Sequence, residues 1–209
     1  MGLTALVMAG GRASRMGGVE KPLLEISGKP MLQHVIEVLK RCGSIDRVIV
    51  ASTPNTPATT ITAERLGAQT IITPGEGFEE DMRFAIRHLS LAEVLLISAD
   101  LPFITPNLVE EAVRNYRASG KPALTVMAPP EVYERLGSRP GYVFEVNGRK
   151  LVPVGINIID GRRINEGPLE QTEMVIDSGE VPINVNTPEE LHVAKKIAEV
   201  EEKTGHGYE

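Results

Sequence analysis

A glycine-rich segment followed by basic residues carries the strongest chemical signal in this chain. Residues 6–23 read LVMAGGRASRMGGVEKPL, so an apolar run ends in paired glycines and three cations follow. Glycines let backbone N–H groups approach phosphate oxygens closely. Arginine can grip a phosphate with two parallel hydrogen bonds, and lysine supplies a point charge. The segment predicts a phosphate-binding loop whose candidate nucleotide-binding residues are Ala9, Gly10, Gly11, Arg12, Ser14, Arg15 and Lys21.

The spacing of this loop differs from two widespread phosphate-binding motifs. No Gly-Lys-Ser/Thr follows the glycines as in a Walker motif, and the loop is not Gly-x-Gly-x-x-Gly either. A glycine-rich turn with solvated bases is the alternative interpretation. The place of the whole string directly after an apolar run favours phosphate binding.

Asp100, which follows the apolar run VLLISA, is the second chemical candidate. A carboxylate at the carboxyl end of a buried strand is a natural contact for Mg²⁺, which usually takes only one or two protein carboxylates besides phosphates and water. An aspartate that caps the next turn is the alternative. Beside a phosphate-binding loop we expect magnesium binding. We therefore expect Arg15, Lys21 and Asp100 to form the catalytic set.

The elements along the chain would bring these residues to one edge of a sheet. Strand-like and helix-like segments alternate over about the first 120 residues. We expect strands at 3–8, 47–51, 69–72 and 94–98, and helices at 30–41, 57–66, 78–89 and 105–118. Alternation of this kind predicts a mostly parallel sheet that binds ligands beyond the carboxyl ends of its strands. Asn55 and Gly77 follow two of these strands and join the candidate nucleotide-binding residues.

The second half of the chain has a different pattern. We expect a strand at 123–127, a hairpin formed by 142–146 and 151–159 around Asn147-Gly148, short strands at 174–176 and 181–185, and a C-terminal helix that opens at Thr187. The fold class is therefore α/β: one Rossmann-like domain over residues 1–209, mostly parallel, with an antiparallel addition in the second half. Apolar hairpin residues such as Tyr142 and Phe144 are compatible with a homodimer.

Composition excludes several other classes of protein. The net charge of -6 argues against a general nucleic-acid-binding surface. No apolar run is long enough to span a bilayer, and we expect no membrane anchor. The single cysteine, Cys42, rules out a disulfide framework and fits a reducing cytoplasm, where we place the protein.

Three stretches of this sequence resemble the MobA-like nucleotidyltransferases. They are AGG…RMGG…EKPL at the N-terminus, ISADLPF at the end of the fourth expected strand, and NVNTPEEL before the last helix. The resemblance implies a reaction in which a nucleoside triphosphate and Mg²⁺ place a nucleotidyl group on a phosphate and release pyrophosphate. It also implies that Asn186 is a second metal contact, although a polar residue before a helix is the alternative.

A closer resemblance is to the archaeal GTP:adenosylcobinamide-phosphate guanylyltransferases, in RMGGVEKPL, STPNTP, GEGFEED and LVPVGINII. It implies GTP as donor and a corrinoid phosphate as acceptor. Gly10 and Gly155 match glycines on which that family depends. Gly155 and Asn157 become the acceptor-binding candidates, because a glycine inside a strand marks a bulge or a close backbone approach.

One residue departs from the superfamily pattern Gly-Gly-x-Gly-x-Arg-Met: Ala13 stands where the third glycine is usual. This departure concerns the detailed phosphate contacts more than the function. Guanine recognition is also open between the backbone of 75–78, Asn55 and the acids at 79–81, at least two of which are explained by helix N-terminal charge. Three alternatives stay open: another MobA-like enzyme with a molybdopterin or sugar-phosphate acceptor, a non-catalytic nucleotide-binding protein, and a purely structural domain.

Overall fold

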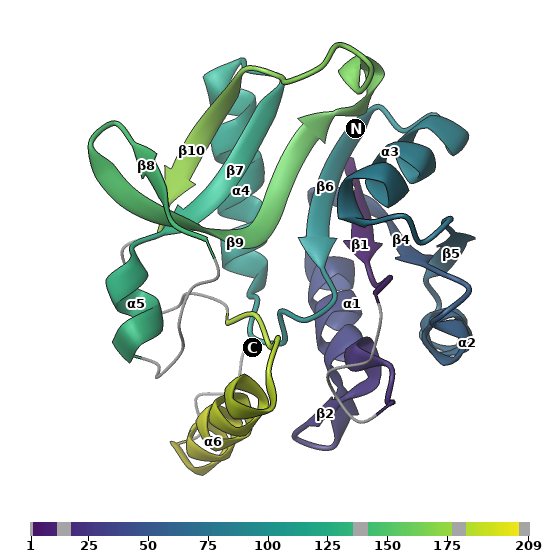
Figure 1. Ribbon diagram of the computed structural model, residues 1–209, viewed down its shortest axis with the longest axis vertical. Helices are drawn as coiled ribbons and strands as arrows, with labels where there is room; N and C mark the ends of the chain where they lie inside the picture. The colour runs from purple at the N-terminus through teal and green to yellow at the C-terminus, as the bar shows by residue number, and fades with distance from the viewer. Residues whose placement is uncertain (1, 12–17, 136–141, 177–182, 205–209) are drawn as a thin grey trace.

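The computed structural model of the chain describes residues 2–11, 18–135, 142–176 and 183–204 (Figure 1). Its main sheet contains β1 (Leu3–Met8), β4 (Ile45–Ser52), β5 (Gln69–Ile72), β6 (Glu93–Ser98), β7 (Ala123–Ala128), β8 (Phe144–Val146), β9 (Arg149–Asp160) and β10 (Gln171–Val175). The strand order is β10-β7-β9-β6-β1-β4-β5, and β8 pairs with β9. A two-stranded sheet joins β2 (Glu25–Ile26) to β3 (Lys29–Pro30).

The first half of the sheet is parallel and the second half is mixed. β1 pairs in parallel with β4 and β6, and β4 pairs in parallel with β5. β9 runs antiparallel to β6, β7 and β8, while β10 and β7 are parallel. The fold is thus α/β with a mostly parallel sheet and antiparallel strands added in the second half, as the sequence predicts.

Helices cover both faces of the sheet. The helices are α1 (Met31–Arg41), α2 (Pro57–Arg65), α3 (Phe78–His88), α4 (Pro106–Ser119), α5 (Pro130–Arg135) and α6 (Pro188–Thr204). Leu3, Ala5 and Val7 of β1 pack in the core shared with α1 and α4, whereas Leu6 and Met8 pack in the core shared with α3. Figure 1 shows α1 and α4 behind the sheet and α3 in front. Burial on both faces explains why β1 is apolar throughout instead of alternating.

One expected strand is wrong in the part that the structure describes. Residues 183–185 form no strand, although Ile183 and Val185 are buried as their apolar alternation suggests. The backbone N–H of Val185 donates to the carbonyl oxygen of Asp100 at 3.1 Å, and its side chain packs in a small core with Met31 and Phe103. A loop buried against a helix thus shows the same alternation of apolar residues as a strand. The short helix α5 was not predicted.

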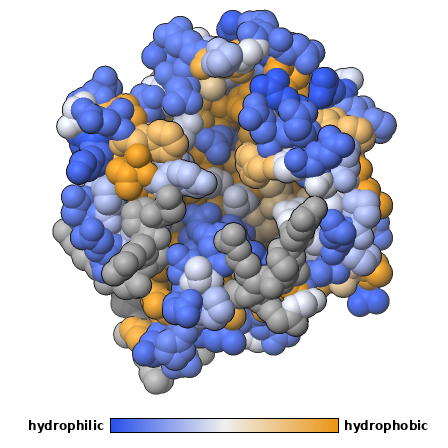
Figure 2. Space-filling view, in the orientation of Figure 1, coloured by the Kyte–Doolittle hydropathy of each residue, from blue (hydrophilic) through white to orange (hydrophobic). Residues whose placement is uncertain are grey.

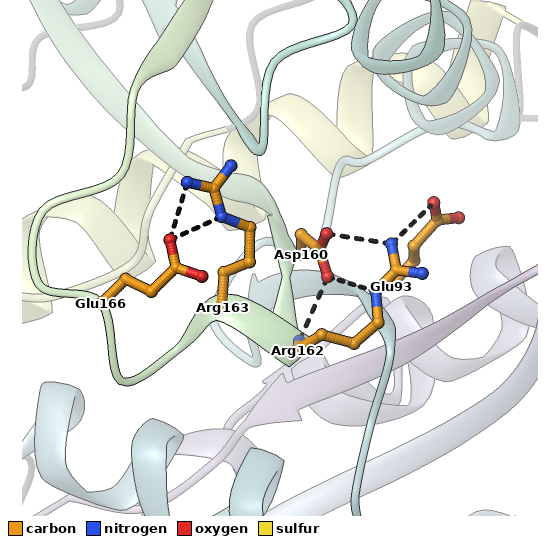
Figure 3. A network of polar contacts seen from close by, with 5 residues as sticks. All are labelled: Glu93, Asp160, Arg162, Arg163 and Glu166. Atoms are coloured by element: carbon orange, nitrogen blue, oxygen red, sulfur yellow. Dashed lines mark hydrogen bonds and ion pairs between the residues drawn. The ribbon is translucent and has the colours of Figure 1, made fainter.

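A network of charged side chains lies at the end of β9 and in the segment that follows it (Figure 3). Asp160 accepts hydrogen bonds from the backbone N–H of Arg162 at 3.1 Å and from its Nε and Nη2 at 2.7 and 2.9 Å. Arg163 pairs with Glu166 at 2.7 Å. The hydrogen bonds from Arg162 hold the pKa of the Asp160 carboxyl below its ordinary value. Because β9 is antiparallel to β6, Asp160 lies beside Glu93 at the amino end of β6.

Among the helices that the structure describes, none is long and apolar enough to cross a bilayer.

Candidate functional site

A cleft of about 470 Å³ opens at the carboxyl ends of β1, β4 and β6. Figure 2 shows this face of the molecule hollowed near its centre. Seven of the predicted site residues line the cleft: Ala9, Gly10, Gly11, Lys21, Asn55, Gly77 and Asp100. The parallel strand order brings these residues together from segments up to 91 positions apart, since parallel strands end at a common edge.

The other six predicted site residues fall into two groups. Arg12, Ser14 and Arg15 lie outside the residues that the structure describes. Gly155, Asn157 and Asn186 are not among the residues that line the cleft. Asn157 lies within the sheet, opposite Leu96 on β6 and Thr125 on β7.

Gly10 is a glycine because the loop after β4 leaves no room for a side chain. A Cβ at this position would lie 2.6 Å from Cγ2 of Thr53, which is itself buried and directly follows β4. The first loop therefore leaves β1 in close contact with the loop after β4. This contact brings the backbone of the glycine pair into the wall of the cleft.

Lys21 and Asp100 form an ion pair on the floor of the cleft. The side chains are 28% and 14% exposed, so the pair is partly shielded but open to a ligand. Lys21 Nζ also donates to Oδ1 of Asn186 at 2.8 Å. One ammonium group thus contacts both residues that the sequence proposed as metal ligands.

Asn184 completes this cluster, and sequence reasoning missed it. Its Nδ2 donates to Oδ1 of Asp100 at 3.3 Å. In an extended segment, residues two apart point to the same side. Asn184 and Asn186 flank the buried Val185 in this way, so the pattern Asn-Val-Asn was the signal that could have found it.

The start of α6 holds Asn186 in place. The backbone N–H groups of Asn186 and Thr187 donate to Oε2 of Glu190 at 2.6 and 3.0 Å, and the N–H of Glu190 donates to Oγ1 of Thr187 at 3.1 Å. This reciprocal arrangement is a capping box. It fixes the backbone of the segment that carries Asn184 and Asn186 beside Asp100.

The three acids at the start of α3 have different environments. Glu79 is exposed and pairs with Arg83 at 2.9 Å, and Glu80 is exposed as well. Asp81 is only 5% exposed, lines the cleft, and accepts a hydrogen bond from the backbone N–H of Gly75 at 2.8 Å. Its Oδ2 lies 3.9 Å from the position that a Cβ on Gly10 would occupy. Asp81 is therefore the acid of the three that faces the cleft.

Gly155 lies at a bulge in β9, and its backbone packs closely against neighbouring side chains. Its φ is +82°, and the pairing of β9 with β7 shifts register in this region. A Cβ here would lie 3.0 Å from Nδ2 of Asn184 and 3.3 Å from Oγ of Ser98, which lines the cleft. The glycine thus packs behind the Asn184–Asp100 contact.

The part of the chain that the structure describes contains no group of three or more His, Cys, Asp or Glu side chains able to hold a metal. A site for Mg²⁺ does not need one, because phosphates and water complete its coordination. Asp100 and Asn186 offer oxygen ligands of the type that Mg²⁺ prefers, and both already contact the Lys21 ammonium. These residues fit a cation.

Comparison with known proteins agrees with this architecture. Residues 5–152 match the model of the MobA-like NTP transferase domain. The chain is 32% identical over 205 residues to the adenosylcobinamide-phosphate guanylyltransferase of Methanocaldococcus jannaschii, with 93% of this chain and 97% of the relative covered. It is 30% identical over 199 residues to a probable molybdenum cofactor guanylyltransferase of Pyrococcus horikoshii, with 92% and 99% covered.

A solved structure shares the fold. The CMP:2-keto-3-deoxy-manno-octonic acid synthetase complexed with CTP superposes with a TM-score of 0.74 at 20% identity, over 98% of this chain and 100% of that one. The likeness extends over the antiparallel second half as well as the parallel first half.

Proposed function

The chain belongs to the MobA-like NTP transferase family, and we propose that it transfers GMP from GTP to adenosylcobinamide phosphate. The products would be adenosylcobinamide-GDP and pyrophosphate, in a late step of cobamide assembly. The observation that carries the proposal is the similarity to the Methanocaldococcus jannaschii guanylyltransferase, which covers nearly the whole of both chains. As a member of this family the protein is a nucleotidyltransferase.

The Pyrococcus horikoshii relative supports a second candidate acceptor, the molybdenum cofactor. Both relatives are named as guanylyltransferases, so guanylyl transfer is common to the two candidates and only the acceptor differs. Identity is similar in the two comparisons, and coverage is nearly complete in both. Acceptor choice must therefore be tested directly.

Phosphate binding is assigned to the first loop. In the proposed complex the backbone of Gly10 and Gly11 faces the triphosphate, with Arg12 and Ser14 beside it and Arg15 on the β and γ groups. Lys21 moves from Asp100 to the α-phosphate, where negative charge is concentrated during transfer. Gly10 and Gly11 line the cleft, which supports this orientation.

Guanine recognition is assigned to the wall formed by the loop before α3 and the first turn of α3. Guanine presents N–H donors at N1 and N2, and a carboxylate accepts from both. Asp81 is buried in this wall with one oxygen already held by Gly75, so its orientation is fixed before GTP binds. Phe78 lines the same wall and is 52% exposed, which suits an aromatic surface under a base. Asn55 lies nearby in the cleft.

Asp100 and Asn186 would hold Mg²⁺ once Lys21 has moved. When bound, Mg²⁺ would neutralise phosphate charge and orient the triphosphate. The acceptor phosphate is already ionised, so no general base is needed. One of its oxygens attacks the α-phosphorus in line, the bond from that phosphorus to the bridging oxygen breaks, and the electron pair leaves with pyrophosphate. Catalysis is then positioning and charge neutralisation.

The acceptor would bind beside the cleft, on the side of β9, the strand that carries Gly155 and Asn157. Gly155 lies against Ser98 and Asn184, next to the Lys21–Asp100 pair, and this closeness supports the assignment. Tyr142 and Phe144 on the neighbouring hairpin are 80% and 51% exposed, which would suit a homodimer contact. Light scattering of the purified protein tests the dimer.

The deciding experiment measures pyrophosphate release with GTP, ATP and CTP, each with adenosylcobinamide phosphate, with a molybdopterin acceptor and with no acceptor. The proposal expects release with GTP and the corrinoid only. Release with GTP and the molybdopterin acceptor would mean that molybdopterin, and not the corrinoid, is the acceptor. Binding of GTP without release in any mixture would favour a protein that kept the nucleotide site and lost the chemistry.

A further inference from the structure

Helix α2 begins without a cap of its own. Pro57 is its first residue and has no N–H to satisfy. Thr56 holds the capping position, but its hydroxyl is turned back into the preceding loop, where it accepts from the N–H of Thr53 at 3.0 Å. The next two N–H groups of the helix, on Ala58 and Thr59, therefore need an acceptor from another part of the chain.

Glu20 supplies that acceptor from 38 residues earlier in the chain. Its Oε1 accepts from the N–H of Ala58 at 2.9 Å. Its Oε2 accepts from both the N–H and the hydroxyl of Thr59, each at 2.6 Å. Thr59 is fully buried, and a carboxylate at a helix N-terminus also interacts favourably with the helix dipole. We call this set of three hydrogen bonds the Glu20 clamp.

The Glu20 clamp joins two walls of the cleft. Glu20 precedes Lys21, and α2 directly follows the loop that carries Thr53 and Asn55. The main chain of Glu20 is held too, because its carbonyl accepts from the N–H of Leu23 at 2.9 Å and the following Pro22 is buried. The residue is thus fixed by its side chain on one wall and by its backbone on the other.

We propose that Glu20 is a positioning residue of the transfer reaction. Through the clamp, it fixes the point where the phosphate-binding loop ends and thereby the position from which the Lys21 ammonium reaches the α-phosphate. This inference rests on the proposed function. Displacement of a charge that acts at the reacting centre lowers turnover more than it lowers substrate affinity, so the expected loss is in kcat.

A matched pair of substitutions separates positioning from general stability. Glu20→Gln and Asp160→Asn each neutralise a carboxylate that accepts three hydrogen bonds. Glu20 lies at the cleft, whereas Asp160 lies at the opposite end of the sheet. We expect Glu20→Gln to lower kcat by about 10- to 100-fold with less than about a threefold change in KM for GTP. We expect Asp160→Asn to leave both within about twofold. A kcat of Glu20→Gln within twofold of the parent overturns the proposal.

A second-site variant tests whether helix capping alone explains the effect. Ala58 is exposed in the first turn of α2, so Ala58→Asp returns an acid to the helix N-terminus without rejoining the two walls. In the double variant Glu20→Gln/Ala58→Asp, the thermal midpoint should recover while kcat stays low. If kcat recovered together with the thermal midpoint, Glu20 would act only as a helix cap, and the positioning role would be overturned.

A third readout does not depend on turnover. Acetylation of lysines by acetic anhydride, followed by mass spectrometry, compares Lys21 with Lys29, which pairs with Glu37 on the surface. Glu20→Gln should accelerate modification of Lys21 several-fold relative to Lys29, and Asp160→Asn should not. If no acceptor supports pyrophosphate release, the proposed function fails, and the labelling ratio still decides whether Glu20 positions Lys21. An unchanged ratio overturns the inference.

Discussion

The two ends of the central sheet both carry charged clusters, and the clusters are built in opposite ways. At the amino end of β6, Asp160 is bonded to Arg162 and Arg163 to Glu166, two or three residues away in the chain, while a longer contact of 4.0 Å joins Arg162 to Glu93. At the carboxyl end, Lys21 meets Asp100 and Asn186 from 79 and 165 residues away. Local pairs form wherever the chain turns, whereas the distant ones exist only when the whole sheet is assembled.

The charged side chains at the amino end of β6 lie on the surface, whereas Lys21 and Asp100 line the cleft. The arginine side chains of the local network are 63% and 45% exposed, and pairs of this kind contribute little to stability. The cleft pair is more shielded and sits beside a volume of about 470 Å³. Substitutions at the two ends should therefore differ greatly in their effect on activity.

Loss of Lys21 should have the largest effect. Lys21→Ala removes the cation proposed to act on the α-phosphate, and we expect kcat to fall by about 10²- to 10³-fold with the fold intact. Pyrophosphate release and circular dichroism measure the two properties. A near-native rate in a folded variant would remove Lys21 from the mechanism.

Asp81→Asn should change the choice of base. The asparagine can still accept from Gly75 through its carbonyl, but its NH₂ group would face the N–H donors of guanine. We expect the preference for GTP over ATP in kcat/KM to fall by about 10- to 100-fold, the worth of one or two hydrogen bonds to a charged group. Glu79→Gln, on the exposed side of the same helix, is the control and should leave the preference unchanged. An unchanged preference in Asp81→Asn would assign guanine recognition to the backbone.

Gly155→Ala should disturb the support behind the cleft pair. The new Cβ would lie 3.0 Å from the amide of Asn184 at a φ of +82°. We expect a loss of about 1–3 kcal/mol in the free energy of unfolding. We also expect a drop in kcat, because Asn184 must move away from Asp100. Gly148→Ala, a hairpin glycine with φ of +75° and open space around it, controls for backbone strain alone. Equal effects of the two substitutions on kcat would contradict the role of the Asn184 contact.

Asp160→Asn should have the smallest effect, and that effect should depend on pH. The pKa of Asp160 is lowered from 3.8 by the hydrogen bonds from Arg162. A carboxyl with a lowered pKa in the folded state contributes stability that is present above its unfolded pKa and is lost as the pH falls through the folded one. Thermal unfolding should therefore show a small constant difference between parent and variant above about pH 5, which shrinks below about pH 4. A difference that grows on acidification would contradict the assignment.

Local signals in the sequence were enough for most of the scaffold. The bounds predicted for β1 and β5 match the structure, and α1, α3 and α4 begin and end within one or two residues of their expected positions. These elements have strong periodicity and clear end signals such as Pro106 at a helix start. The segment 183–185 shows the limit of such signals, because burial against a neighbouring helix imitates the alternation of a strand.

The sequence by itself determined which chemistry is predicted for the chain. Glycines and cations after an apolar strand, and an aspartate after another, predict phosphate and metal binding wherever those strands lie, because the signal is in residue type and short spacing. Tertiary structure alone decided that Glu20 caps α2, that Asn184 supports Asp100, and that Asp81 is the acid that turns inward. Each of these depends on the distance between segments far apart in sequence, and that distance is set by the strand order and packing of the whole sheet.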